Sequence, residues 1–229
     1  MTASEDRNLV NNEEESLSKR LSVWLRKHYL AIINILLALY VGLPILAPIL
    51  MKTGQVNLAN RIYKLYRPLC HQLAYRSFFL FGEQAYYPLE IAGIEGVKSF
   101  ELVTGLEAGD TQAASAFVGN EELGYKIALC QRDLAIYGSL LLFGLVFALS
   151  GRKLKALPWL AWLVLALLPM GLDGLSQLLG NMSLPGLSWI SLRESTPFLR
   201  VLTGAMFGWF TAWFGIPSID EIVNEKEAV

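Results

Sequence analysis

The stretch YLAIINILLALYVGLPILAPILM, residues 29–51, contains no charged side chain. A bilayer core about 30 Å thick needs roughly 20 apolar residues in a helix, so this stretch is long enough to cross it. It is also longer than the core of a signal peptide, which has roughly 7 to 15 residues. We therefore predict an uncleaved first transmembrane helix, kinked in its second half by Pro44 and Pro48, which lack a backbone N–H donor.

The composition of the whole chain favours the same class of protein. Of its 229 residues, 54% are hydrophobic and 17% are charged, whereas a soluble domain carries about 25% charged residues. Three further apolar runs predict transmembrane helices at 127–150, 158–180 and 197–216. The expected fold is thus an all-α integral membrane protein with four transmembrane helices. The lipid bilayer is its expected partner. A net charge of −1 gives no basic surplus for nucleic acid, which we exclude as a partner.

The distribution of basic residues predicts the orientation. Lys and Arg gather at the end of segment 1–28 and in the loop 151–157, and basic segments beside transmembrane helices stay in the cytoplasm. With four crossings, segments 1–28 and 217–229 are both cytoplasmic. The region 52–126 and the loop 181–196 then lie outside.

Two parts of the outer region have patterns of their own. An apolar helical stripe opposite Arg61, Lys64 and Arg67 predicts an interfacial amphipathic helix at 57–67. Packing of this helix on the protein's own outer surface fits the pattern equally well. The Cys-His segment 70–81 ends in apolar residues and is a candidate for a re-entrant element.

Several polar residues lie toward the outer ends of the predicted helices. Cys130, Asp133 and Tyr137 share one helix face, and Asp173 and Gln177 form an i,i+4 pair. Charged groups inside a membrane cost roughly 2.5–3.5 kcal/mol and usually face the bundle interior. Either a structural ion pair or a functional site would explain them. The predicted polar cluster consists of Gln72, Arg76, Arg132, Tyr137, Asp173, Gln177, Arg193 and Arg200.

The side chains of Cys70, His71, Cys130 and Asp133 offer two further possibilities. Thiolates, imidazole and carboxylate are ligands that zinc accepts in tetrahedral sites. On an oxidising side of the membrane the two cysteines could instead form a disulfide. The sequence leaves both open and indicates no other cofactor.

The motifs on the outer side resemble those of a known family. They are Cys70-His71-Gln72, Arg76-Ser77-Phe78, Cys130-Gln131-Arg132, Tyr137-Gly138, Asp173-Gly174 with Gln177, and Arg200 with Thr203-Gly204. In these the chain resembles a family of uncharacterised bacterial and archaeal multi-pass membrane proteins, known only as a domain of unknown function. Asp133 stands where that family has the second cysteine of Cys-x-Arg-Cys, and the stretch between Gly82 and Cys130 is longer than usual. The resemblance implies the plasma (inner) membrane of a bacterium or archaeon.

Three classes of function fit these observations. We favour an accessory or scaffold protein whose outward-facing polar site takes a membrane-protein partner, a lipid headgroup or a metal. A small transporter or channel component would use Arg132, Asp133 and Asp173 to line a polar path. A thiol redox protein or enzyme would use the cysteines and His71. No complete catalytic motif is present, so the sequence does not favour an enzyme.

Overall fold

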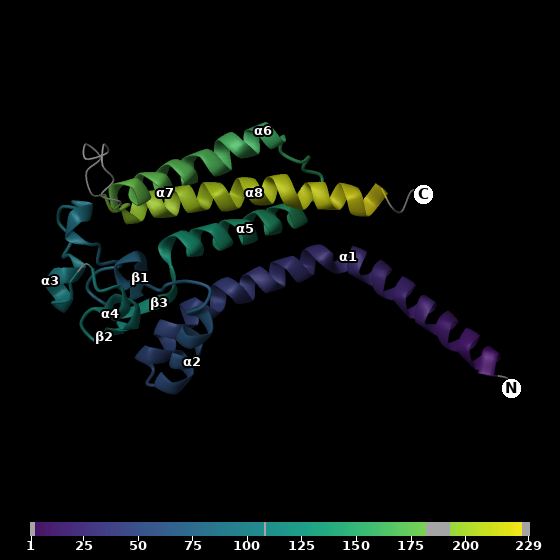
Figure 1. Ribbon diagram of the computed structural model, residues 1–229, viewed down its shortest axis with the longest axis horizontal. Helices are drawn as coiled ribbons and strands as arrows, with labels where there is room; N and C mark the ends of the chain where they lie inside the picture. The colour runs from purple at the N-terminus through teal and green to yellow at the C-terminus, as the bar shows by residue number, and fades with distance from the viewer. Residues whose placement is uncertain (1–2, 108, 182–192, 226–229) are drawn as a thin grey trace.

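Long helices lie side by side in the computed structural model, with a small sheet at one end (Figure 1). The structure describes residues 3–107, 109–181 and 193–225. Helix α1 (Ala3–Lys52) begins, and helix α8 (Pro197–Glu225) ends, away from the sheet. We call the two ends of the bundle the sheet end and the Arg152 end, after the loop that joins α5 to α6.

Three helices of the described residues are long and apolar enough to cross a membrane: Lys19–Lys52, Gln131–Leu149 and Trp159–Leu179. They correspond to the first three predicted transmembrane helices. Helix α8 does not meet the same criterion, because Trp, Gly and Thr interrupt its apolar residues. It nevertheless lies along α5 (Gln131–Leu149) and continues well past the predicted end at 216.

The outer surfaces of these helices carry exposed apolar side chains. Examples are Ile35, Leu36 and Leu39 in α1, Leu142, Leu145 and Leu149 in α5, and Leu172, Leu175 and Leu178 in the third helix. A soluble monomer rarely exposes so large an apolar area, so these surfaces are suited to lipid.

Small residues let the helices approach closely. A Cβ atom on Gly204 would lie 2.7 Å from the carbonyl oxygen of Arg132, and one on Gly208 would collide with the carbonyl oxygen of Ile136. Both glycines therefore bring α8 against the backbone of α5 in a Gly-x-x-x-Gly pattern. Likewise Gly144 of α5 lies against the side chain of Asn34 in α1.

Prolines lie within three of the long helices, among them Pro217 of α8. Pro44 and Pro48 are buried inside α1, which continues through both. The third predicted helix, 158–180, consists of α6 (Trp159–Trp162), a π-helical turn η3 (Leu163–Leu167) and α7 (Leu168–Asn181). Pro169 follows the π-turn, where its ring would clash with the carbonyl group four residues earlier in a regular helix.

The three-stranded antiparallel sheet corrects the all-α prediction. Its strands β1 (Ser77–Leu80), β2 (Gly119–Asn120) and β3 (Gly124–Cys130) lie in the order β1-β3-β2. The predicted helix 127–150 is therefore wrong at its start, because residues 127–130 belong to β3 and α5 begins at Gln131. Ile127, Ala128 and Leu129 are all buried, so the sequence here lacks the alternation of a half-exposed strand. Such a continuous apolar run is also typical of a buried helix.

The sheet also explains segment 70–81. Strand β1 pairs with β3, with Phe79 opposite Lys126, and the Phe79 side chain is only 3% exposed. Its ring packs edge to face on the ring of Tyr87, with 5.1 Å between the ring centroids. The rings of Phe100 and Phe117 pack in the same way, with centroids 5.8 Å apart. Phe79 therefore belongs to a protein core, whereas Phe81 at the end of the same segment is 52% exposed. The shorter elements around this core are η1 (Ala74–Arg76), η2 (Glu90–Ala92), α3 (Phe100–Thr104) and α4 (Thr111–Ala116).

Helix α2 (Val56–Tyr66) lies close to the range 57–67 expected for the amphipathic helix. It buries Ala59, Ile62, Tyr63 and Tyr66, and the last two donate hydrogen bonds to the carbonyl oxygens of Lys126 and Tyr40, at 2.6 and 2.9 Å. One apolar strip of α2 thus packs on the protein itself. Leu58 and Leu65 are exposed on the remaining surface. The predicted loop 181–196 lies mostly outside the described residues, as do residues 226–229 of the predicted C-terminal tail.

Candidate functional site

Asp173 of α7 is the centre of one buried ion cluster at the sheet end. It forms ion pairs with Arg132 of α5 and with Arg193, whose Nη2 lies 3.5 Å from Oδ1. The hydroxyl group of Ser195 donates to both carboxylate oxygens at 2.9 Å. Asp173 therefore joins α7 to α5 and to the segment that leads into α8.

Glu194 is the centre of a second cluster beside it. Arg76, the last residue of η1, binds its carboxylate through Nε and Nη2 at 2.8 and 2.9 Å. Arg200 of α8 pairs with the same carboxylate and also donates to the carbonyl oxygen of Ser195 at 3.1 Å and to Oε1 of Gln177 at 3.3 Å. This cluster ties the region around the sheet to α8.

Together the two clusters hold more positive than negative charge. Four guanidinium groups surround the two carboxylates, and Arg200, Asp173 and Glu194 are buried. The Nε atom of Arg132 is buried with no hydrogen-bond partner among the described residues, as is Nε2 of Gln177. Both atoms are enclosed by the protein, and Gln177 lies behind Arg200, to which its Oε1 is hydrogen-bonded.

A cavity of about 290 Å³ opens beside the clusters. Its lining includes three of the four guanidinium groups, those of Arg76, Arg132 and Arg200, and one carboxylate, that of Asp133. The other lining residues are Leu69, Cys70, His71, Gln72, Leu73 and Cys130. This cavity brings together most of the predicted site residues.

The two thiols and Asp133 form a compact group at the cavity wall. One donor atom from each of Cys70, Cys130 and Asp133 lies within 4.8 Å of the others. The structure has both cysteines as free thiols. A hydrogen bond from the thiol of Cys130 lowers the pKa of Cys70, and the same bond together with burial raises the pKa of Cys130. His71 lines the cavity but does not belong to this group of donors.

Gln72 and Lys126 hold the Cys-His-Gln segment in place. Gln72 has a left-handed backbone (φ 51°), and its side-chain amide donates to the carbonyl oxygen of Tyr63 at 2.9 Å. Its own carbonyl oxygen accepts from Nζ of Lys126 at 2.7 Å, and Nζ also donates to the carbonyl oxygen of Ser115 at 2.8 Å. The Lys126 side chain is fully buried, and desolvation lowers its pKa to about 7.

Sequence reasoning did not single out Lys126, Glu194 or Ser195. Lys126 is a single basic residue beside an apolar run, and only its place in β3 shows that its side chain is buried against the Cys-His-Gln segment. In the predicted polar cluster four arginines outnumber the single carboxylate, that of Asp173, and this excess was the available signal for Glu194. Conversely, Tyr137 does not line the cavity, because its ring packs on Tyr40 at 4.4 Å between α5 and α1.

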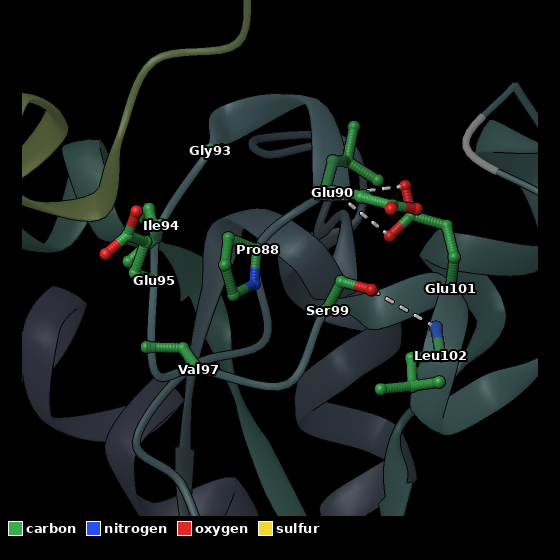
Figure 2. Close-up of a pocket in the computed structure, with 10 residues that line it drawn as sticks. Pro88, Glu90, Gly93, Ile94, Glu95, Val97, Ser99, Glu101 and Leu102 are labelled. Carbon is green, nitrogen blue, oxygen red and sulfur yellow. Dashed lines mark hydrogen bonds between the residues drawn. The ribbon is translucent and has the colours of Figure 1, made fainter.

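A larger hollow of about 700 Å³ lies among the loops beyond the sheet. Figure 2 shows Glu90 and Glu101 close together and Glu95 on the other side. The carboxylate of Glu101 accepts from the backbone N–H of Glu90 at 3.1 and 3.2 Å, and Ser99 accepts from the N–H of Leu102 at 3.3 Å. These polar groups stabilise the loops themselves, so we regard the arginine-lined cavity as the better candidate.

Comparison with known proteins agrees with this membrane architecture. Residues 122–214 match a family described as "Predicted membrane protein (DUF2085)". The resemblance to a family of uncharacterised membrane proteins is therefore confirmed. The matched stretch contains most residues of the two clusters and part of the cavity wall. These are Cys130, Arg132, Asp133, Asp173, Arg193, Glu194, Ser195 and Arg200.

One relative extends the similarity beyond this stretch. The chain is 25% identical over 209 residues to "Uncharacterized protein MJ1492" of Methanocaldococcus jannaschii, an alignment that covers 88% of this chain and 99% of the relative. No solved structure matches the chain.

Proposed function

We propose that this protein is an accessory membrane protein whose arginine-lined cavity binds the phosphate headgroup of an anionic lipid. It crosses the plasma membrane of a bacterium or archaeon four times, with the sheet end outside and both chain ends in the cytoplasm. The observation that carries the proposal is the cavity lining, which has three guanidinium groups and one carboxylate.

The arrangement of the helices supports four crossings. Helix α8 lies along α5, and α1 begins at the same end of the bundle at which α8 ends. Arg152, Lys153 and Lys155 lie at that end too, which agrees with the preference of basic loops for the cytoplasm. The sheet end, with its eight acidic residues between Glu83 and Glu122, then faces outward.

The chemistry of the cavity suits a phosphate group. A guanidinium group presents a planar fork of donors that matches phosphate oxygens, and it stays charged at every physiological pH. Three arginines line the cavity, and each is also held in place by an ion pair with Asp173 or Glu194. The positive charge that the two buried carboxylates leave uncompensated favours an anion further.

The size and position of the cavity favour a lipid headgroup. Its volume of about 290 Å³ is near the lower limit of small-molecule pockets, so a phosphate with its glycerol fits and a whole lipid does not. It lies at the ends of the spanning helices, at the depth of headgroups. Leu69, which lines it, is an exposed apolar residue beside which an acyl chain can pass.

The distribution of charge favours this function over transport. Helix α5 carries no charged residue after Asp133, and α8 carries none between Arg200 and Asp220. A polar path that starts at the cavity therefore has no charged group to continue it through the apolar part of these two helices. A binding site at one face requires no such path.

Lipid analysis of the purified protein tests the proposal. We expect full-length protein in mild detergent to retain an anionic phospholipid at about one per chain, and Arg132→Gln to reduce that retention at least tenfold. Arg152→Gln is the matched control, because it removes a paired arginine from the other end of the bundle and should retain the lipid.

A second variant covers the case in which Arg132→Gln does not fold. Arg76→Lys keeps the positive charge beside Glu194 but removes the fork, and we expect it to weaken retention severalfold in a protein of normal size-exclusion profile. Retention of lipids in the proportions of the membrane would contradict the proposal. Displacement of the lipid by millimolar inorganic phosphate would assign the cavity to a soluble anion instead.

A further inference from the structure

We infer that Cys70, Cys130 and Asp133 form a zinc-binding site with two thiolate ligands and one carboxylate ligand. This inference does not rest on the headgroup proposal, because its ligands are not the arginines that would bind the headgroup. The three residues lie on separate parts of the chain, and the fold brings them together.

The geometry of the donors is the first argument. Cys70 follows α2, Cys130 is the last residue of β3, and Asp133 lies in the first turn of α5, yet their donor atoms lie within 4.8 Å of one another. Zinc binds sulfur at about 2.3 Å and carboxylate oxygen at about 2.0–2.2 Å, so ligand atoms of a tetrahedral site are roughly 3.3–3.8 Å apart. Shifts of about an ångström would close the site around the ion.

Backbone hydrogen bonds hold the two sulfur atoms in place. The N–H of Cys130 donates to Sγ of Cys70, and the N–H of Asp133 donates to Sγ of Cys130, each at 3.4 Å. Such outer contacts orient metal ligands and stabilise the thiolate form.

The charges around the site permit a divalent cation despite the neighbouring arginines. Arg132 pairs with Asp173, while Arg76 and Arg200 share Glu194. When zinc binds two cysteines, each thiol releases its proton to solvent, and two protons leave as one Zn²⁺ enters. The net charge of the site is therefore unchanged, and the guanidinium groups favour the thiolates that the metal needs.

The ligand types select zinc over other common metals. Magnesium and calcium take oxygen ligands and are poorly matched to two thiolates. Copper(I) prefers thiolate or thioether ligands throughout, whereas zinc accepts sulfur and carboxylate together. Three protein ligands leave a fourth position, and because the donors lie in the cavity wall, water or an anion from the cavity fills it.

Metal analysis of the full-length protein tests this inference. Protein purified in detergent with a reductant, stripped with a chelator and reloaded with zinc should contain about one zinc per chain, and zinc should raise its melting temperature. We expect Cys70→Ser and Cys130→Ser to lower zinc affinity at least a hundredfold, and Asp133→Asn at least tenfold. Asp110→Asn is the control, because Asp110 caps α4 and takes no part in the group.

Cobalt loading of the wild-type chain gives a readout that needs no variant. Co²⁺ bound by two thiolates should produce a sulfur-to-metal charge-transfer band, which zinc then removes. Absence of this band, zinc binding that is equal in both cysteine variants, or a Cys70–Cys130 disulfide as the sole state in protein prepared without reductant would overturn the inference. Because lipid retention is measured separately, none of these results bears on the headgroup proposal.

Discussion

The two ends of the helix bundle both join helices through arginine and carboxylate side chains, but they do so in different surroundings. At the sheet end, four arginines share Asp173 and Glu194, and Arg200 is only 4% exposed. At the other end Arg152 lies 3.4 Å from Asp220, and its side chain is 35% exposed. Water screens the Arg152 pair more than the pairs of Arg132 and Arg200, whose side chains are 17% and 5% exposed, so the loss of a partner should matter more at the sheet end.

Asp173→Asn should cause the largest loss of stability at the sheet end. It leaves Arg132, whose side chain is 17% exposed, without its carboxylate, and an uncompensated buried charge costs about 3–5 kcal/mol. Chemical or thermal unfolding of the purified protein measures the loss. Asp110→Asn, at an exposed cap, should change stability by much less, and equal losses from the two variants would contradict the distinction between buried and exposed sites.

Gly208→Ala and Gly215→Ala compare how closely α8 is packed at two positions along its length. Its new Cβ would collide with the carbonyl oxygen of Ile136, so we expect a loss of about 1–3 kcal/mol in the free energy of unfolding. A Cβ on Gly215, farther toward the Arg152 end, would meet no atom of the described residues within 4 Å. Gly215→Ala should therefore be close to neutral, and a similar loss from both variants would show that α8 does not pack closely on α5 at Gly208.

Lys126→Met tests the buried sheet end through the pH dependence of the free energy of unfolding. The folded pKa of Lys126 is about 7 against an ordinary value of 10.5, because burial and the charge of Arg67 lower it more than Cys70 raises it. Between pH 7 and 10.5 the unfolded chain binds a proton that the folded chain has released, so this group makes stability rise with pH. We expect the wild type to gain about 1 kcal/mol relative to the variant between pH 7 and 8.

Unfolding of both proteins at each pH measures this difference, in which the titration of other groups cancels. A constant difference between the two proteins from pH 6 to 9 would contradict a buried, readily deprotonated Lys126.

Arg152→Gln should have the smallest effect. The Arg152 side chain is partly exposed, and the buried Asp220 keeps its hydrogen bond from the Tyr29 hydroxyl group, so the pair should contribute about 0–1 kcal/mol. Stability in detergent should hardly change, and added salt should have little further effect on the variant. A loss as large as that of Asp173→Asn would remove the distinction between the two ends.

The sequence predicted the parts of the fold that depend on local pattern. The uncharged runs located the spanning segments of α1, α5 and the third helix, since length and hydropathy alone identify them. Strand β3 was missed because a strand buried on both faces and a membrane helix share one apolar pattern. Its position depends on pairing with β1, which no local pattern encodes.

The same limit applies to the candidate site. The polar residues were recognised because charge near a membrane helix needs a partner, and Arg132 with Asp173 was one of the expected combinations. The register that places Ser77 opposite Cys130 brings the Cys70 segment to the start of α5. Such proximity between distant segments follows from the sheet, so the roles of Lys126 and Glu194 could be assigned only from the structure.

Cys130 is both the last residue of β3 and the N-cap of α5, so no linker separates the sheet from the helix. A turn of the strand about its long axis must therefore turn the first residues of the helix as well. Because α5 is in backbone contact with α8 at Gly204 and Gly208, that rotation reaches a second helix whose far turns hold Asp220 beside Arg152. The protein thus has a continuous connection, through closely packed backbones, from the sheet end of the bundle to the Arg152 end.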